Sequence, residues 1–266
     1  MALSPSVMGI VNVTPDSFFP DSRTLATADA VRRGKAHFDA GCDIVDVGGE
    51  STRPGATPVP VDEEIARAVP VIAALSAFGP VSVDTQKEPV ARAAIAAGAR
   101  VLNDVSSNLV DVAAELGVGY IAMHRLGDST VMQVNPTYGD VVGEIAEFLS
   151  SMAQRAKDAG VTTLWLDPGI GFGKTTEHNI ALMAHLSHFV TLARDYGAGV
   201  VIGTSRKRFL GDFGGELLDV DQRLEGSIAT EAWALLQGVS MVRVHDAGAA
   251  VQLRELLVRP VEEVVA

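Results

Sequence analysis

Short apolar runs and amphipathic stretches alternate along the whole chain, and each apolar run ends in a polar residue. The runs are continuous, as is typical of parallel strands that are covered on both faces. They end at Asn12, Glu50, Asp84, Asn103 with Asp104, His124, Asp167, Ser205 and His245. The pattern therefore predicts eight strands, each with a polar residue where it leaves the core.

Alanine-rich stretches with helical periodicity lie between these runs. Several of them stop at a glycine just after the last apolar position, which is a common helix end, at Gly41, Gly98, Gly160 and Gly238. The predicted helices cover residues 30–40, 63–75, 88–98, 110–116, 141–160, 178–190, 222–238 and 248–258.

Alternating strands and helices indicate a parallel sheet. Eight such units in 266 residues match the count and size of a (β/α)8 barrel. A doubly wound open sheet is the main alternative, but it would carry a glycine-rich phosphate fingerprint after its first strand, and NVTPDSF is not one. We expect one α/β domain over residues 1–266, a TIM barrel with its active site at the C-terminal ends of the strands.

Composition narrows the possible partners. The net charge of -12 argues against nucleic acid, and an anionic substrate would need a local basic cluster. Cys42 is the single cysteine, so an intrachain disulfide is impossible and a reducing compartment is indicated. We interpret it as a small apolar residue buried in the core. Neither a signal peptide nor an apolar stretch of about 18 residues is apparent. We therefore predict a cytoplasmic protein without a membrane span.

Three strand ends carry carboxylate and amide groups, at Asp84, Asn103 and Asp167. Such a set suits a planar heterocycle with an amino-amide edge, because a carboxylate accepts two parallel N–H bonds. The alternative is that each of these residues caps the helix or turn that follows it.

Cations also gather near the predicted strand ends. An arginine inside an otherwise apolar strand, as in RVH, requires a buried partner, because an unpaired buried charge is costly. These groups can hold an anion within an acidic protein, and they are Arg53, Lys207, Arg208, Arg243 and His245.

Two motifs resemble sites that the spacing does not support. DPGIGFGKT looks like a P-loop, but its first glycine would fall at Pro168, so a tight loop with close backbone approach is the better interpretation. One predicted helix carries three histidines, His178, His185 and His188. No carboxylate or cysteine at a suitable spacing completes a set of zinc ligands, so we expect these histidines on the helix surface and not in a zinc site. The same applies to His37.

The ordered set of motifs resembles one family. MGIVNVTPDSF, DVGGESTRPGA, SVDT, NDVSS, MH followed by MQ, DPGIGFGKT, GTSRKRFLG and RVHD cover the chain from end to end. They are similar to the dihydropteroate synthases of folate biosynthesis. The resemblance implies a pterin-binding barrel, usually a homodimer and a sulfonamide target. It would join p-aminobenzoate to 6-hydroxymethyl-7,8-dihydropterin pyrophosphate with Mg²⁺ assistance, by a dissociative substitution at the pterin methylene.

The resemblance also implies roles for individual residues. Pterin binding would fall to Asp84, Asn103, Asp167, Lys207 and Arg243. Pyrophosphate binding would fall to Asn12, Arg53, Arg243 and His245, with Asn12 as the Mg²⁺ ligand. The p-aminobenzoate site would contain Thr52, Arg53, Lys207 and Arg208. The expected catalytic residues are Asp84, Lys207, Arg243 and His245.

The sequence departs from the family in two loops. Where the first loop usually has an aspartate followed by two glycines, this chain has Pro20, Asp21, Ser22 and Arg23. We therefore expect a stiffer first loop, with Asp21 as a candidate substitute for the usual aspartate. The segment RLGDSTVMQ after His124 lacks the usual proline.

Two other functions remain open at this point. A pterin-binding barrel that moves the methyl group of methyltetrahydrofolate to a corrinoid protein would share the pterin carboxylates, but it would have less reason to keep Lys207, Arg243 and His245. A catalytically silent paralogue should have lost pterin or anion residues, and all of them are present.

Overall fold

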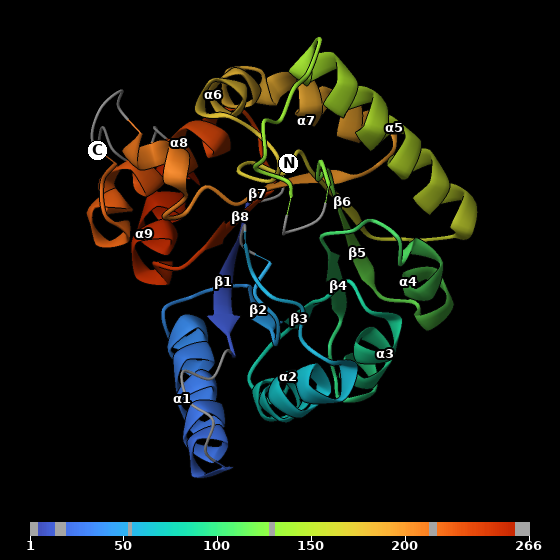
Figure 1. Cartoon of the computed structure of the whole chain (residues 1–266), viewed down its shortest axis with the longest axis vertical. Helices are drawn as coiled ribbons and strands as arrows, with labels where there is room; N and C mark the ends of the chain where they lie inside the picture. The colour runs from blue at the N-terminus through green and yellow to red at the C-terminus, as the bar shows by residue number, and fades with distance from the viewer. Residues whose placement is uncertain (1–4, 14–19, 53–54, 128–130, 213–216, 259–266) are drawn as a thin grey trace, which may run out of the picture.

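The computed structural model describes residues 5–13, 20–52, 55–127, 131–212 and 217–258, with the backbone alone for residues 20–25. The strands close into one parallel barrel in sequence order, and helices surround them (Figure 1). The strands are β1 (Ser6–Asn12), β2 (Ile44–Gly48), β3 (Val81–Asp84), β4 (Val101–Asp104), β5 (Gly119–Met123), β6 (Leu164–Asp167), β7 (Gly199–Ile202) and β8 (Met241–Val244). The predicted (β/α)8 barrel is confirmed.

Most helices follow the predicted stretches. They are α1 (Pro20–Asp39), α2 (Val61–Leu75), α3 (Glu88–Ala96), α4 (Val110–Leu116), α5 (Val141–Ala159), α6 (Thr176–Ala184), α7 (Leu186–Asp195), α8 (Leu224–Leu236) and α9 (Ala247–Val258), with the short 3₁₀ helices η1 (Arg208–Gly211) and η2 (Val220–Arg223). The four predicted glycine stops all have positive φ, at 96°, 116°, 90° and 90° in chain order.

Two helix predictions were wrong. The single helix expected over residues 178–190 is two helices, because the backbone leaves the helical region at His185 (φ -111°, ψ 22°). The helix expected from residue 30 begins at Pro20, so residues 20–23 form its first turn and not part of a stiff loop. Proline is well suited to a first helical position, since its missing N–H has no partner there in any case.

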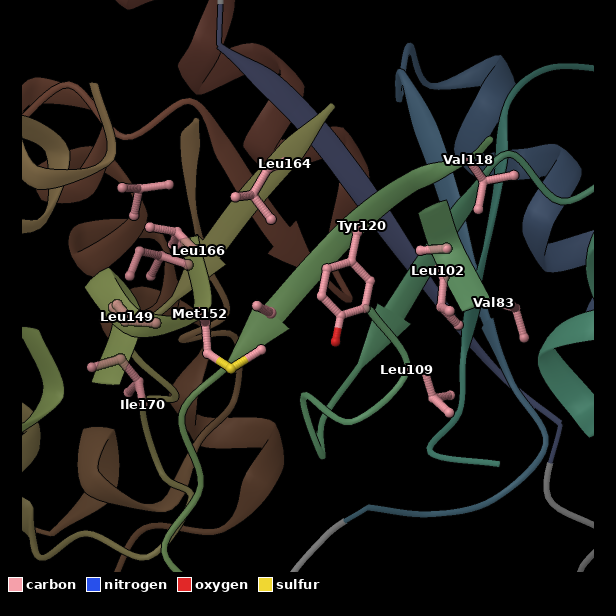
Figure 2. Close-up of a cluster of buried hydrophobic side chains, with 14 of the residues drawn as sticks. Val83, Leu102, Leu109, Val118, Tyr120, Leu149, Met152, Leu164, Leu166 and Ile170 are labelled. Atoms are coloured by element: carbon pink, nitrogen blue, oxygen red, sulfur yellow. The ribbon is translucent and has the colours of Figure 1, made fainter. Parts of the chain in front are cut away.

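The main core lies between the sheet and the helices. Figure 2 shows part of it, where Tyr120 of β5 and Leu166 of β6 lie near Leu149 and Met152 of α5. Tyr120 is fully buried, and its hydroxyl donates to Oδ2 of Asp104 at 2.8 Å. This core packs against the outer faces of the strands. It thereby holds in place the side chains that point from the inner faces into the barrel.

A second apolar layer fills the bottom of the barrel. Because side chains alternate along a strand, residues two positions further along point into the same interior, one layer nearer the C-terminal mouth. The bottom layer consists of Met8, Ile44, Val101, Ile121, Val201 and Met241, packed against Trp165. Two residues after Ile44, Val101, Trp165 and Met241 come Asp46, Asn103, Asp167 and Arg243. Inside the barrel, an apolar layer of side chains is thus followed directly by a polar layer at the C-terminal mouth.

Candidate active site at the barrel mouth

Six polar side chains gather at the C-terminal mouth of the barrel, and we refer to them as the mouth cluster. Five come from strands β2, β3, β4, β6 and β8, and Lys207 comes from the segment after β7. The mouth cluster consists of Asp46, Asp84, Asn103, Asp167, Lys207 and Arg243. Five of the six were candidates from the sequence, and Asp46 was not.

Arg243 links three strands across the barrel. Its Nε donates to Oδ2 of Asp46 at 2.7 Å, and its Nη2 donates to Oδ2 of Asp84 at 2.8 Å. Burial disfavours the charged guanidinium, but the two carboxylates raise its pKa above the ordinary value. The predicted buried partner of the arginine is therefore a pair of aspartates.

Asp84 keeps one oxygen without a hydrogen-bond partner in the described part of the chain. Burial, opposed by the Arg243 charge and reinforced by Asp46, raises the pKa of Asp84 to about 7. Its Oδ1 is buried and makes no hydrogen bond within the described part of the chain, and the same is true of Oδ1 of Asp46. Buried polar atoms without partners are rare and require an explanation, such as a ligand or an ion.

Asn103 belongs to the mouth cluster, whereas its neighbour Asp104 does not. The Asn103 amide donates from Nδ2 to Oδ2 of Asp46 at 2.9 Å. Asp104 faces the opposite side of the sheet, where its Oδ2 accepts from the Leu109 backbone N–H at 2.8 Å as well as from Tyr120. Asp104 therefore caps the turn that follows β4, which is the alternative role that the sequence left open for Asp84, Asn103 and Asp167.

Asp167 and Lys207 face each other across the glycine loop. Oδ1 of Asp167 accepts from the Gly169 backbone N–H at 2.7 Å. Burial raises the pKa of Asp167, against the charge of Lys207, while burial lowers the pKa of Lys207 to about 8, against the charge of Asp167. The Lys207 ammonium donates to the Ile170 carbonyl and lies 4.5 Å from the centre of the Phe172 ring.

The glycine loop of DPGIGFGKT makes the close backbone approach that its sequence predicts. Gly169 has φ 71°, and a Cβ at this position would overlap the His124 carbonyl oxygen. Beneath the loop, the buried Lys174 ammonium donates to the Phe172 carbonyl at 3.0 Å and lies 3.0 Å from Nδ1 of His124. Burial lowers the pKa of Lys174 to about 7 and that of His124 to about 3. These two residues support the loop from below.

The segment after β2 is tied down by a network that the sequence did not reveal. The Lys87 ammonium donates to Glu50, to Glu64 and to the Val59 carbonyl, each at 2.6 Å. Glu50 also accepts from the Val59 backbone N–H at 2.5 Å. The strand-end Glu50 therefore anchors the chain that follows it and does not enter the mouth cluster.

The remaining candidates are placed around the rim. Oγ of Ser205 accepts from the His245 backbone N–H at 3.1 Å and lies 3.2 Å from its Nδ1. Asn12 is half-buried at the end of β1, and Thr52 is half-buried after β2, whereas Arg208 is exposed at the start of η1. Thr52 and Arg208 make no hydrogen bond with the mouth cluster in the parts of the chain described. Arg53 and the side chain of Asp21 lie outside the described residues.

The histidines set aside from the sequence have structural partners. His178 forms a capping box with Thr175 at the start of α6, as its Nδ1 accepts from the Thr175 N–H at 3.2 Å. His37 was expected on a helix surface, which was wrong: its Nε2 lies 3.0 Å from the Ile10 carbonyl oxygen, and its ring packs against Gly9. No group of three or more His, Cys, Asp or Glu residues suited to a metal occurs among the described residues. Cys42 is buried, as predicted.

A single observation in the sequence could have identified Asp46. DIVDVGG carries an aspartate in the middle of a run that is otherwise apolar, which is the same signal that singled out Arg243 in RVH. Two opposite charges in separate buried strands are natural partners once the sheet closes. Without the closure, however, their sequence separation of 197 residues gives no indication that they meet.

Comparison with known proteins relates this site to a family. Residues 8–245 match the model of the pterin binding enzymes. The dihydropteroate synthase of Escherichia coli is 40% identical over 252 residues, which are 91% of this chain and 86% of that protein.

Solved structures agree with this relationship. The Xanthomonas albilineans dihydropteroate synthase with 4-aminobenzoic acid has a TM-score of 0.87 and 42% identity, covering 100% of this chain and 94% of that one. The Thermus thermophilus enzyme in complex with 6HMPPP has a TM-score of 0.81 and 38% identity, with 97% and 94% covered.

Proposed function

The chain belongs to the pterin-binding enzymes, among their dihydropteroate synthases, and we propose that its mouth cluster holds the dihydropterin pyrophosphate. These transferases condense 6-hydroxymethyl-7,8-dihydropterin pyrophosphate with p-aminobenzoate in folate biosynthesis. The observation that carries the assignment is the buried Oδ1 of Asp84, which has no hydrogen-bond partner among the described residues, at a barrel mouth lined by three carboxylates and two cations. A ligand N–H would supply the missing hydrogen bond.

The pterin edge is assigned to the carboxylates and the amide. The 2-amino group and N3–H of a pterin form a donor pair that matches one carboxylate, and we assign this edge to Asp167. Asp84 and Asn103 are register partners on the neighbouring strands β3 and β4, and we assign them to the remaining polar atoms of the ring. Lys207 lies between the pterin and the second substrate, as its contact with Phe172 and its charge interaction with Asp167 support.

The reaction that we propose is dissociative. The bond between the pterin methylene carbon and the bridging oxygen breaks, and its electron pair leaves with pyrophosphate. The amine nitrogen of p-aminobenzoate then bonds to the methylene carbon and loses a proton to solvent. Arg243 and His245 stabilise the departing anion, while Asp84 stabilises the cationic pterin. Electrostatic partners of this kind typically contribute about 2.7–4 kcal/mol each to the barrier.

A single protein ligand for Mg²⁺ fits the residues at the rim. Mg²⁺ prefers hard oxygen donors and is usually held by one or two protein groups, water and substrate phosphates. Asn12 is half-buried at the C-terminal end of β1 and can supply an amide oxygen, in agreement with the absence of a multi-residue metal cluster among the described residues. When bound, the ion would neutralise charge on the leaving pyrophosphate.

The p-aminobenzoate site is assigned to the rim beside Lys207. Thr52 and Arg53 belong to the segment that follows β2, and Arg208 is exposed next to Lys207. The Glu50–Lys87–Glu64 network supports this assignment, because it fixes both ends of the segment from Glu50 to Val59. Arg208 would attract the benzoate carboxylate in this arrangement.

Two further features of the family are also proposed for this chain. A homodimer is supported by apolar side chains left exposed on neighbouring helices, namely Ile180 of α6 with Trp233 and Leu236 of α8. A cytoplasmic location is supported by the single cysteine. Among the described residues, none of the helices is long and apolar enough to cross a bilayer.

Turnover of the purified protein tests the proposed function. Dihydropteroate is quantified by chromatography and pyrophosphate by a coupled assay, with either substrate or Mg²⁺ omitted in turn. We expect equal amounts of both products, and only when both substrates and the ion are present. Binding of the pterin pyrophosphate without turnover would instead indicate a silent paralogue, and loss of response to p-aminobenzoate would exclude the synthase assignment.

A further inference from the structure

Asp46 lies one layer deeper in the barrel than Asp84, because it pairs with the residue two positions before that aspartate on β3. Its side chain is fully buried, with 0% exposed, and its strand neighbour on β3 is Ser82. A single oxygen of Asp46, Oδ2, accepts two hydrogen bonds, one from Nε of Arg243 at 2.7 Å and one from Nδ2 of Asn103 at 2.9 Å. One buried carboxylate therefore orients two residues that we place in the pterin site.

The guanidinium of Arg243 donates hydrogen bonds to two carboxylates that lie at different depths in the barrel, Asp46 and Asp84. Its Nε and Nη2 form one edge of the group, and this edge is used by Asp46 and Asp84. In the described part of the chain, Nη1 makes no hydrogen bond. Because Asp46 holds Nε, the guanidinium cannot turn to donate from both Nε and Nη2 to Asp84. The other edge of the group, formed by Nη1 and Nη2, stays available to an anion.

The same division keeps Asp84 available to a ligand. If Asp46 did not hold Nε, Arg243 could pair side by side with both oxygens of Asp84, which is the preferred geometry of arginine with a carboxylate. Among the described residues, Oδ1 of Asp84 is buried and has no hydrogen-bond partner. Asp46 thus prevents the arginine from neutralising Asp84 completely.

We propose that Asp46 is the positioning residue of the site, which holds Arg243 and Asn103 in the orientation that binds the pyrophosphate and the pterin. This inference rests on the proposed function for its substrates. In this proposal Asp46 acts through the two side chains that it orients.

A competing effect has the opposite sign and makes the proposal testable. Removing a carboxylate next to an anion site raises the local positive charge, which alone would tighten binding of pyrophosphate. If orientation dominates, loss of the hydrogen bonds must weaken binding in spite of this gain. Asp46→Asn removes the charge but keeps an oxygen for Nε and Nδ2, whereas Asp46→Ala removes both. The two variants therefore separate charge from orientation.

The experiment measures the affinity for inorganic pyrophosphate by calorimetry and the steady-state constants for both substrates. We expect Asp46→Ala to weaken pyrophosphate binding and kcat/KM for the pterin pyrophosphate by about 10- to 100-fold, the size of a lost charge-assisted hydrogen bond. The KM for p-aminobenzoate should stay within about threefold, since Asp46 does not orient that site. Asp46→Asn should restore most of both losses.

Ser82→Ala is the matched control. Ser82 occupies the same layer on the adjacent strand, and its Oγ is buried and makes no hydrogen bond to any residue that the structure describes. The variant should leave binding and turnover unchanged. Asp46→Leu, whose side chain has the same branching as aspartate and fills the cavity, replaces Asp46→Ala if the cavity prevents folding.

Several outcomes would overturn the proposal. These are tighter pyrophosphate binding in both variants, equal losses in Asp46→Asn and Asp46→Ala, or a failure of both Asp46→Ala and Asp46→Leu to fold. A failure of the proposed function is distinguishable, because the wild type would then form no dihydropteroate. The pyrophosphate affinities would still report whether Asp46 orients Arg243.

Discussion

Arg206 and Asp246 form a bidentate ion pair between the loops that follow β7 and β8. Nε of the arginine lies 2.9 Å from Oδ2 of the aspartate, and Nη2 lies 2.7 Å from Oδ1. Arg206 has φ 58°, an uncommon conformation for a residue with a side chain. Each partner is next in sequence to a candidate anion ligand, since Lys207 follows Arg206 and His245 precedes Asp246. The ion pair therefore sets the distance between the two ligands.

Asp246→Ala should loosen both loops. We expect a stability loss of about 2 kcal/mol, from two charge-assisted hydrogen bonds of a partly exposed pair. Turnover should fall further than stability explains, with kcat/KM for the pterin pyrophosphate about 10- to 100-fold lower, because small displacements of binding groups are costly to rate. Urea unfolding and steady-state kinetics measure the two effects.

Glu115→Ala is the control for this pair. Glu115 makes a bidentate contact with Arg92, but Glu115 is largely exposed and Arg92 is only half-buried, on helices away from the mouth cluster. Pairs that are screened by solvent contribute little to stability, so neither stability nor kinetics should change appreciably. Equal effects of Asp246→Ala and Glu115→Ala would contradict the role given to the Arg206–Asp246 pair.

Gly169→Ala should disable the glycine loop. The new methyl group would overlap the His124 carbonyl oxygen, and the residue would keep a positive φ. The loop must then move, and with it the N–H that holds Asp167. We expect severe loss of pterin binding by calorimetry, together with a lower melting temperature.

Gly117→Ala separates the two causes. Gly117 has φ 65°, close to that of Gly169, but nothing lies within 4 Å of the added Cβ. This variant should lose only the roughly 1–2 kcal/mol of the left-handed conformation and keep full pterin affinity. If Gly169→Ala behaves in the same way, close packing against His124 is not what shapes the loop.

Glu231→Gln should increase stability at alkaline pH. Glu231 is buried on α8, and burial, reinforced by the charge of Asp246, raises its pKa from 4.5 to about 8. Between these two values the folded protein keeps a proton that the unfolded chain has lost, so wild-type stability from this group falls as pH rises. The neutral amide avoids that loss.

Urea unfolding at pH 5 and pH 8 measures the difference. The advantage of Glu231→Gln over the wild type should grow by about 3 kcal/mol across this interval, following 1.36 kcal/mol for each pKa unit. Glu115→Gln serves as the comparison. Arg92 lowers the pKa of Glu115, so this carboxylate is largely charged in the folded and the unfolded protein over the interval, and the variant should gain no advantage as pH rises. An advantage that is independent of pH would show that Glu231 is charged in the folded state.

The barrel and most of its mouth could be predicted because they depend on local sequence. Each strand is a short apolar run, and Asp84, Asn103 and Asp167 stand where such runs end, which in a barrel is one face of the molecule. The start of α1 at Pro20 and the break at His185 were missed, since hydrophobic periodicity indicates where helices exist better than where they begin or end.

Residues that support the site could not be located in the same way. Asp46, Lys174 and Lys87 each act through a partner that is distant in sequence, and only the closed barrel brings the partners together. A buried charge predicts that a partner exists, but it does not say which one. His37 was misjudged for the same reason, because its contact with Ile10 depends on how α1 packs on β1.

The rate of dihydropteroate formation by Asp84→Ala and Lys207→Ala tests the central claim most directly. Both side chains belong to the mouth cluster, and neither is part of the apolar core. With folding verified by circular dichroism, we predict that kcat/KM falls by about 100- to 1000-fold in each variant, as expected for removal of one electrostatic partner of the transition state. Rates near those of the wild type in either folded variant would contradict the assignment of the mouth cluster as the active site.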